Sequence, residues 1–361
     1  VKVGGDLSII GFSRYGFDLE KRDVGTAGHP VDANGLAHIA NIKITADLTD
    51  AVMVTTIVRN EKIWGGSTET VGTTSVNHGD GNVYLAAAFA TFKEMFGQPL
   101  TVKAGALGFK MGSGLLVADP NTNRTSAGPF NYQLADYCPR KAFTGFVGTY
   151  DLAPLVLTGA ALKVTDGITN GSADVNVYAA NAAFDLKEAG MQNGSANVYT
   201  VYKDAKKDQT GNVGFLVQAS PVENFDASLE YCYQTQKNIR ADKEAADDAA
   251  IRATLGTKMP DVVLAPAISV DYTRLSDNWD PMYEDWTPAD IANVLFVNTN
   301  VQAFGATVGA KPMTDVGMSL RYAYFRLVEK ISAYSNDWNS SYNLNTGKKS
   351  LGQELDVHFT Y

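Results

Sequence analysis

The chain of 361 residues is 45% hydrophobic and only 19% charged, and it holds 33 glycines but two cysteines. This composition excludes a disordered chain, a coiled coil and a disulfide-stapled scaffold. The formal net charge is −9, from 30 Lys and Arg against 39 Asp and Glu, which argues against nucleic acid as a partner because its phosphates must be neutralised by cationic side chains.

Sixteen β-strands are predicted from runs of about 9 to 14 residues, most of which alternate apolar and polar side chains. No apolar run approaches the roughly 18 to 20 residues of a transmembrane helix, so a helical membrane protein is excluded. In chain order the predicted strands cover residues 5–18, 34–47, 51–63, 81–94, 99–110, 141–150, 153–165, 174–186, 194–205, 211–220, 224–237, 249–258, 261–274, 293–310, 315–328 and 350–361.

The connections between these strands alternate between short and long. Tight turns follow the even-numbered strands, as at residues 48–50 and 260–261, whereas most connections after odd-numbered strands are long and polar, as at 111–140. This rhythm is typical of an up-and-down antiparallel barrel with short turns at one rim and long loops at the other. The sequence therefore predicts an all-β transmembrane barrel of about sixteen strands, with eighteen as the alternative. It would occupy residues 1–361 as a single domain, closed by pairing of the last strand with the first.

Within the strands, one face is apolar and the other is polar or ionic. In the last strand Leu355, Val357 and Phe359 alternate with Glu354 and Asp356. Alternation alone fits both a membrane barrel and a soluble sheet that buries its apolar face. The segregated turn lengths and the aromatic residues near strand ends favour the membrane barrel, and a soluble or surface-attached β-protein is the alternative.

The C-terminal part of the chain carries a Lys311-Pro312 turn, a Tyr- and Phe-rich segment at 320–326 and a closing Leu-Gly-Gln-Glu-Leu-Asp segment at 351–356. With these elements, residues 293–361 resemble the C-terminal part of outer-membrane barrels of the alginate-export and related porin type. The Gly-rich segment 105–117 is a second, weaker similarity. The resemblance implies a bacterial outer-membrane barrel. Relatives usually carry an Arg after the first glycine of the Gly-rich segment, whereas this chain has Ala.

A barrel of about sixteen strands is too wide for its side chains to fill, so an aqueous channel is expected. The positive side chains on its polar face belong mostly to the first seven strands and the negative ones mostly to the last six. Such a transverse field favours polar solutes; alternatively, the charges only pair across strands and hydrate the lumen. The expected pore-lining residues are Arg14, Lys43, Arg59, Lys103, Lys163, Asp226, Glu230, Asp271, Arg321, Glu354 and Asp356.

The longest connection, residues 111–140, follows the fifth strand. A loop of this length without secondary structure is usually functional or disordered. It is expected either to fold into the lumen and narrow it, or to rise above the membrane and shield the mouth. Cys138 in this loop and Cys232 in the eleventh strand lie in the same half of the barrel, so a disulfide between them and two free thiols both stay open.

The connection after the thirteenth strand carries Asp277, Asp280, Glu284 and Asp285 among aromatic residues. Hard cations take oxygen ligands, so a Ca²⁺ site, or divalent bridges to lipopolysaccharide phosphates, is one interpretation, and a solvated acidic loop is the other. No cofactor is expected. Recognisable catalytic motifs are absent and the four histidines lie far apart in the sequence, so an enzyme is not expected.

These features predict an outer-membrane porin, a passive diffusion channel for small hydrophilic solutes or ions, surrounded by outer-membrane lipid and lipopolysaccharide. One alternative is a structural or scaffold outer-membrane barrel that binds an envelope or surface partner. The other is an exporter of an anionic, alginate-like polysaccharide. The sequence holds no decisive signal for or against a homo-oligomer.

Overall fold

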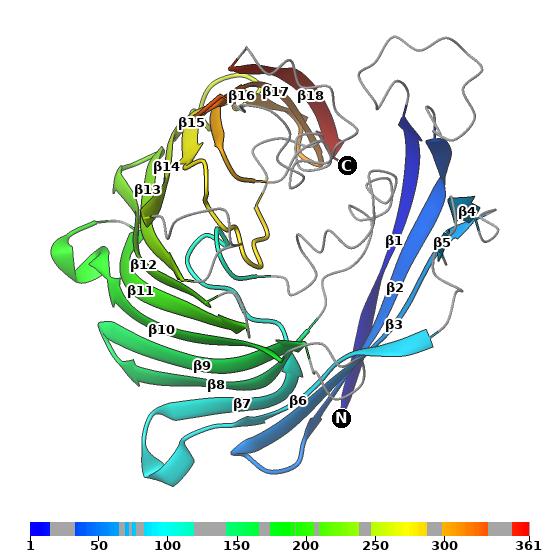
Figure 1. Cartoon of the computed structure of the whole chain (residues 1–361), viewed down its shortest axis with the longest axis vertical. Coiled ribbons are helices and arrows are strands. Elements are labelled where there is room, and N and C mark those ends of the chain that lie inside the picture. The colour runs from blue at the N-terminus through cyan, green and yellow to red at the C-terminus, as the bar shows by residue number, and fades with distance from the viewer. Residues whose placement is uncertain are drawn as a thin grey trace.

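The computed structural model describes residues 1–14, 33–64, 69–71, 74–76, 83–118, 142–165, 174–191, 193–205, 209–237, 247–286, 298–330 and 349–360. Sixteen strands form one sheet in which each strand pairs antiparallel with its neighbours along the chain, and a two-stranded hairpin stands apart (Figure 1). The predicted all-β, up-and-down architecture of sixteen strands is therefore confirmed.

Every predicted strand has a counterpart in the sheet, displaced by a few residues at most ends. None of the helical segments in the described residues is long and apolar enough to cross a membrane. The elements are β1 (Lys2–Arg14), β2 (Ala33–Asp47), β3 (Val52–Trp64), the hairpin strands β4 (Glu69–Val71) and β5 (Thr74–Val76), β6 (Val83–Phe92), the 3-10 turn η1 (Met95–Gly97), β7 (Leu100–Leu107), β8 (Phe143–Leu152), β9 (Leu155–Thr165), β10 (Val175–Asp185), the 3-10 turn η2 (Leu186–Ala189), β11 (Asn193–Ala205), β12 (Gln209–Val222), β13 (Phe225–Lys237), β14 (Asp247–Lys258), β15 (Ala267–Leu275), β16 (Val301–Met313), β17 (Val316–Leu327) and β18 (Ser350–Thr360).

The sheet is strongly curved, and its two faces differ in chemistry (Figure 1). Large apolar side chains stand exposed on the convex face, among them Leu7 at 64%, Val198 at 61% and Leu355 at 64%. Because successive side chains of a strand point to opposite faces, the residues between them face the concave side. An exposed apolar band that continues from strand to strand is typical of a surface that contacts lipid.

The concave side holds a hydrophobic cluster that joins the sheet to two segments folded inside its curve. One segment is residues 108–118, which follow β7 and whose Leu115, Leu116 and Val117 are at most 1% exposed. The other is residues 276–286, which follow β15 and contribute the buried Trp279. Both project into the space inside the curve of the sheet (Figure 1), so this interior is partly filled.

The short turn predicted at residues 260–261 is wrong. An eight-residue connection spans 259–266 instead, with hydrogen bonds from the Met259 N–H to the Pro266 carbonyl and from the Ala265 N–H to the Val262 carbonyl, both 2.8 Å. Proline has no N–H to donate to a ladder, and the two prolines, Pro260 and Pro266, delay the start of β15.

The hairpin of β4 and β5 was not predicted, because its strands are three residues each.

Closure of the barrel by pairing of the last strand with the first does not occur among the described residues. Here β1 pairs with β2 and β18 pairs with β17, and the order of the sheet runs from β1 to β18 without a ladder between those two. Figure 1 shows the two edge strands on opposite sides of an opening. The alternation that predicted the strands carries no information on this pairing, because pairing of edges depends on the curvature of the whole sheet.

Candidate functional site

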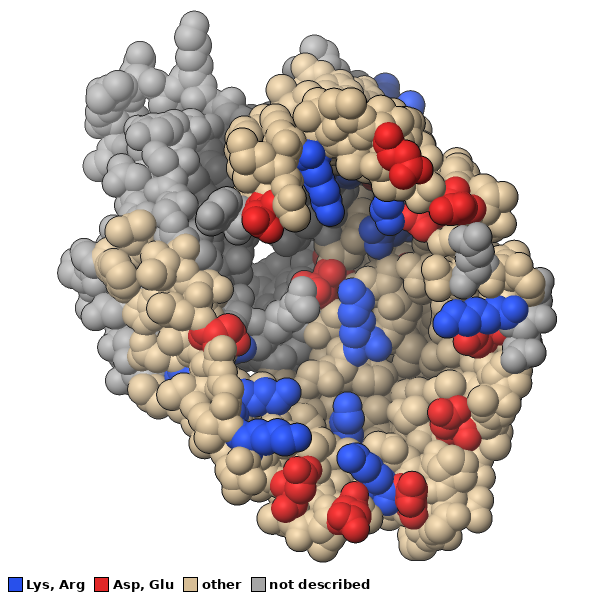
Figure 2. All heavy atoms as spheres, turned by 180° about the vertical axis from the view of Figure 1, so that it is seen from behind, with Lys and Arg blue, Asp and Glu red and all other residues tan. Residues whose placement is uncertain are grey.

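Away from the hydrophobic cluster the concave face is polar, because there the strands place most of their apolar residues on the convex side. On β13, for example, Glu230, Cys232 and Gln234 are at most 1% exposed on the concave side, whereas the intervening Leu229 and Tyr233 are exposed. Figure 2 looks into a hollow of the molecule and shows Lys and Arg together with Asp and Glu on its wall and around it. Charges of both signs therefore border one open space.

Glu230 joins the wall to the first inward segment. Its carboxylate accepts a hydrogen bond from the Tyr199 hydroxyl at 2.8 Å, and it accepts two from Ser113, one from the backbone N–H at 3.2 Å and one from the hydroxyl. Gly112 has φ +57°, and a Cβ there would lie 2.4 Å from Glu230 Oε1. The glycine thus permits the close approach of residues 108–118 to the wall.

Arg321 on β17 and Asp271 on β15 form a two-pronged ion pair across the intervening strand. The distances are 2.7 Å from Nη1 to Oδ1 and 3.0 Å from Nη2 to Oδ2, and Nη1 also donates to Thr307 Oγ1 at 3.1 Å. Gly305 lies between them, since a Cβ there would meet Arg321 Nη2 at 2.4 Å. Such a bidentate geometry fixes both side chains on the wall.

Acidic and basic side chains alternate along this part of the wall. Arg252 on β14 is the direct cross-strand partner of Glu230, and its guanidinium carbon lies 5.4 Å from the centre of the Trp286 ring, a cation–π geometry. Asp356 on β18 is the cross-strand partner of Arg321 and is 8% exposed. Arginines thus interrupt a region that the sequence predicted to be mostly negative.

The first strands carry a separate polar row. Arg59 Nε donates to Asn41 Oδ1 at 2.7 Å, and Asn41 Nδ2 donates to Asp6 Oδ2 at 2.8 Å, which links β3, β2 and β1. Lys43 and Lys103 also face the concave side, and Lys103 pairs in register with the buried Thr91. Three cationic side chains, Arg59, Lys43 and Lys103, therefore lie on this wall in the described part of the chain.

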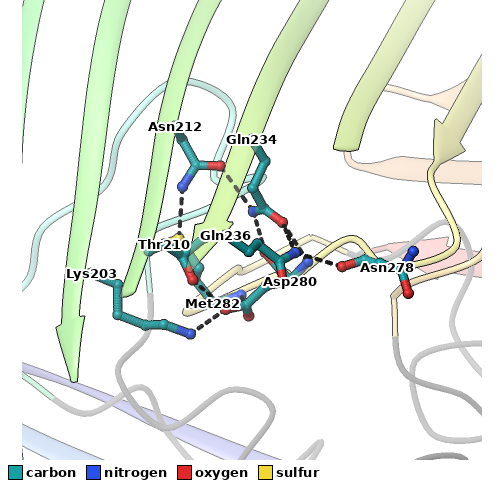
Figure 3. Close-up of polar contacts among 8 residues, drawn as sticks. All are labelled: Lys203, Thr210, Asn212, Gln234, Gln236, Asn278, Asp280 and Met282. Atoms are coloured by element: carbon teal, nitrogen blue, oxygen red, sulfur yellow. Dashed lines mark hydrogen bonds and ion pairs between the residues drawn. The ribbon is translucent and has the colours of Figure 1, made fainter. Parts of the chain in front are cut away.

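The second inward segment, residues 276–286, is held on β11, β12 and β13 by a network of polar side chains (Figure 3). Asp280 forms an ion pair with Lys203 and accepts from Thr210 Oγ1 at 3.2 Å. Gln234 donates to the Asp280 carbonyl at 2.9 Å and accepts from the Asp280 N–H at 2.8 Å, and Gln236 donates to the Asn278 carbonyl at 2.6 Å.

The two inward segments also bind each other. The Tyr283 N–H donates to the Leu116 carbonyl at 2.8 Å, and the Ala118 N–H donates to the Tyr283 carbonyl at 2.7 Å. The Asp285 N–H donates to the Gly114 carbonyl at 2.9 Å. Together they form one internal structure, whose polar attachments to the wall include Ser113 on Glu230 and Asp280 on Lys203.

The predicted pore-lining residues divide into three groups. Lys163 does not face the concave side: it follows Leu162, which is 2% exposed in the concave cluster, so it points outward, where it forms a 3.5 Å ion pair with Asp174. The side chain of Arg14 lies outside the described residues. Strand alternation places the others on the concave face, namely Lys43, Arg59, Lys103, Asp226, Glu230, Asp271, Arg321, Glu354 and Asp356.

The candidate metal ligands do not converge. Asp280 pairs with Lys203, and Glu284, which is fully buried, accepts a hydrogen bond from Asn298 at 2.8 Å. No group of three potential ligands lies close enough for a metal ion in the part of the chain that the structure describes. Asp277, Asp280, Glu284 and Asp285 therefore do not form a common cation site in this structure, and two of them, Asp280 and Glu284, instead help to fix the inward segment.

Two predictions fall partly outside the described residues. Of the connection 111–140, residues 111–118 lie inside the curve of the sheet and the rest is not described. Cys232 is a free, fully buried thiol on the concave face, and Cys138 lies outside the described residues.

Several important residues escaped the sequence analysis. Arg252 sits in a strand whose Ala-rich pattern, 249–253, does not reveal its faces. Tyr199 was missed because tyrosine in a membrane strand is more often an interfacial residue on the outer surface. Lys203 could have been predicted to face inward, because it lies two residues after Val201 and residues two apart in a strand share a face.

Comparison with known proteins supports the fold. No family model and no curated protein matches the chain. Among solved structures, it is similar to OpdO of Pseudomonas aeruginosa, with a TM-score of 0.57 and 13% identity over 92% of this chain and 82% of that one. It is also similar to OccAB3 of Acinetobacter baumannii, with a TM-score of 0.56 and 12% identity over 91% of this chain and 83% of that one.

At such low identity these similarities show the fold, a sheet of the kind found in porin barrels. They give no support to the resemblance to alginate-export barrels, since the similar structures are Opd and Occ proteins.

Proposed function

We propose that the chain is a bacterial outer-membrane porin, a passive channel for small hydrophilic solutes or ions. The observation that carries the proposal is the segregation of the two faces of one sixteen-stranded sheet, with exposed apolar side chains outside and charged side chains inside. A membrane-spanning sheet must satisfy its backbone within the sheet and present apolar side chains to lipid. The fold shared with OpdO and OccAB3 supports the same assignment.

The proposal includes a lumen narrowed by the two inward segments. They are packed against the wall by hydrogen bonds and by the hydrophobic cluster, so they reduce the open cross-section rather than hang free. The lumen left beside them is bordered by Arg59, Lys43 and Lys103 on one side and by the alternating charges of β13–β18 on the other. A solute that is well hydrated or dipolar gains most by entering such a field. Residues 1–361 are proposed to act as a single barrel domain, and no enzymatic role is assigned to it.

Planar-bilayer recording tests the proposal. Purified protein inserted into a lipid bilayer is expected to give stepwise ohmic currents, and a salt gradient is expected to give a reversal potential of modest size because both signs of charge line the lumen. A barrel that inserts yet carries no current would contradict the proposal and favour a structural role. Strong anion selectivity together with block by uronate oligomers would favour a polysaccharide exporter.

A further inference from the structure

A cavity of about 690 Å³ opens on the concave wall near the short turns, over strands β9–β14. It lies directly next to the charged cluster along the strands: Ser228 is two residues from Glu230, and Thr254 is two residues from Arg252. A solute that passes the charged cluster toward the short-turn rim therefore meets this cavity next.

The floor of the cavity is a row of four uncharged polar side chains in direct register. Ser195 on β11 pairs with Gln218 on β12, Gln218 pairs with Ser228 on β13, and Ser228 pairs with Thr254 on β14. All four alternate with convex-face residues and so point to the concave side. Adjacent strands lie about 4.8 Å apart, so the row presents a hydrogen-bonding group at regular intervals across four strands.

Three of these side chains keep their hydrogen-bonding capacity. In the part of the chain that the structure describes, no hydrogen bond is made by the side chains of Gln218, Ser228 or Thr254. Hydroxyl groups and amides each donate and accept. The cavity therefore offers donors and acceptors that are not already used to hold the wall together.

The charges at the cavity are balanced within the protein. Asp226 accepts from Lys258 Nζ at 2.9 Å and from Ser220 Oγ at 2.7 Å. Asp185 and Lys187, which also line the cavity, supply one charge of each sign. The cavity thus has no net charge that would select an ion, and its free groups match the hydroxyls of an uncharged solute.

We propose that this row is a binding subsite for uncharged, hydroxyl-rich solutes of oligosaccharide type on their way through the pore. The proposal rests on the proposed function as a channel. A linear oligosaccharide presents hydroxyls along its length, so it matches a regular row of donors and acceptors better than a compact solute does. Binding is weak, since the hydrogen bonds replace those to water and each contributes only about 1 kcal/mol net.

The experiment uses maltotriose as the neutral probe and trigalacturonate as an anionic probe of the same length, each added to the full chain in a planar bilayer. Maltotriose is expected to reduce the ion current in a saturable way. Gln218→Leu removes the amide with little change of volume, and Ser228→Leu fills the cavity. Each is expected to weaken the block about three- to tenfold, the effect of about one lost hydrogen bond.

Ser319→Leu is the matched control, because Ser319 lies on the concave face near the same rim but outside the cavity. It is expected to leave the block by maltotriose unchanged. If trigalacturonate blocks at lower concentration than maltotriose, or if neither cavity variant changes the maltotriose block, the subsite is disproved.

Different results would disprove the subsite and the assignment of the protein as a channel. A conducting pore without saccharide block disproves only the subsite. If the protein carries no current, calorimetric titration of maltotriose into detergent-solubilised protein decides the matter: binding that Gln218→Leu weakens supports the subsite, and an absence of binding overturns it.

Discussion

Tyr199 occupies space that its cross-strand partner leaves open. Gly214 is in register with Tyr199, and a Cβ at Gly214 would lie 2.4 Å from the ring carbon Cζ and 2.7 Å from the hydroxyl. The ring is 3% exposed and its hydroxyl is bound to Glu230. The tyrosine therefore cannot move aside without releasing the carboxylate that holds Ser113.

Gly214→Ala is expected to destabilise the protein by about 1 to 3 kcal/mol, the usual cost of overpacking. The change is measured as a lower urea midpoint for unfolding in detergent micelles. Gly148→Ala is the control, because nothing lies within 4 Å of a Cβ at Gly148. Equal stability of the two variants would show that Tyr199 is not fixed as described.

A second prediction concerns the contribution of the Arg321–Asp271 ion pair to stability and ion selectivity. Its side chains are 21% and 13% exposed, so Arg321→Ala leaves a largely buried carboxylate without its cation, which costs about 3 kcal/mol. In the channel the same change removes a positive charge from the wall. The reversal potential in a salt gradient is therefore expected to shift toward cation selectivity.

The matched change is Lys258→Ala, which breaks an ion pair whose side chains are 67% and 50% exposed. Exposed pairs contribute little to stability, so unfolding is expected to stay near that of the parent protein. If Arg321→Ala behaved like Lys258→Ala in unfolding, the bidentate pair would not have the stabilising role assigned to it.

Alternation of side chains placed most of the predicted charged residues on the concave face, because each strand has only two faces. It failed at Lys163 because β9 carries apolar residues on both faces: Leu157 lies on the outward face with Lys163, whereas Leu162 faces inward. Only the assembled sheet shows which of these two faces is the inner one. The pairing of Arg321 with Asp271, two strands away, is likewise a property of the assembled sheet.

At the level of strands and loops, inward folding was predicted from the sequence for one of the two inward segments but not for the other. The length of the connection 111–140 pointed to a special role, and inward folding was one of two expectations for it. The acidic residues of 276–286 were interpreted either as a cation site or as a solvated loop, yet Trp279 and Glu284 are buried. The Asp280 carboxylate finds its partners on β11 and β12, strands distant in the sequence that only the fold brings close.

Asp280→Ala is expected to loosen the segment 276–286, because it removes the ion pair with Lys203 and the hydrogen bonds from Thr210 and the Met282 N–H. The cost is about 2 kcal/mol of local stability. Faster cleavage within this segment by an added protease, together with noisier single-channel currents, is the expected result.

Asp174→Ala is the control for the ion-pair loss, since Asp174 pairs with the outward-facing Lys163 and is half exposed. It is expected to leave both readouts at the parental level. If Asp280→Ala also left cleavage and current noise unchanged, the hydrophobic contacts of Trp279 and Met282 would suffice to hold the segment, and the polar network would be dispensable.

At the scale of the whole sheet, β1 and β18 are the two edge strands, and no ladder joins them within the described ranges. An unpaired edge leaves backbone N–H and C=O groups without partners, which hydrocarbon does not tolerate. Both strands carry exposed apolar residues on the convex face, such as Leu7 and Leu355. In a bilayer the two edges are therefore expected to pair directly and close the channel.

Both strands have one end at the short-turn rim and run in opposite directions there, so an antiparallel closure brings Val3 near Phe359 and Leu7 near Leu355. Cysteine pairs at these positions, in a background with Cys138 and Cys232 replaced by serine, are expected to form an intramolecular disulfide on mild oxidation in membranes, because bridging requires Cα atoms within about 7 Å. A mobility shift on a non-reducing gel reports it. The pair Leu7 with Phe359, two register steps away, is expected to cross-link less. If a conducting channel formed no disulfide at either pair, nor at pairs shifted by two residues, another strand would have to lie between β1 and β18.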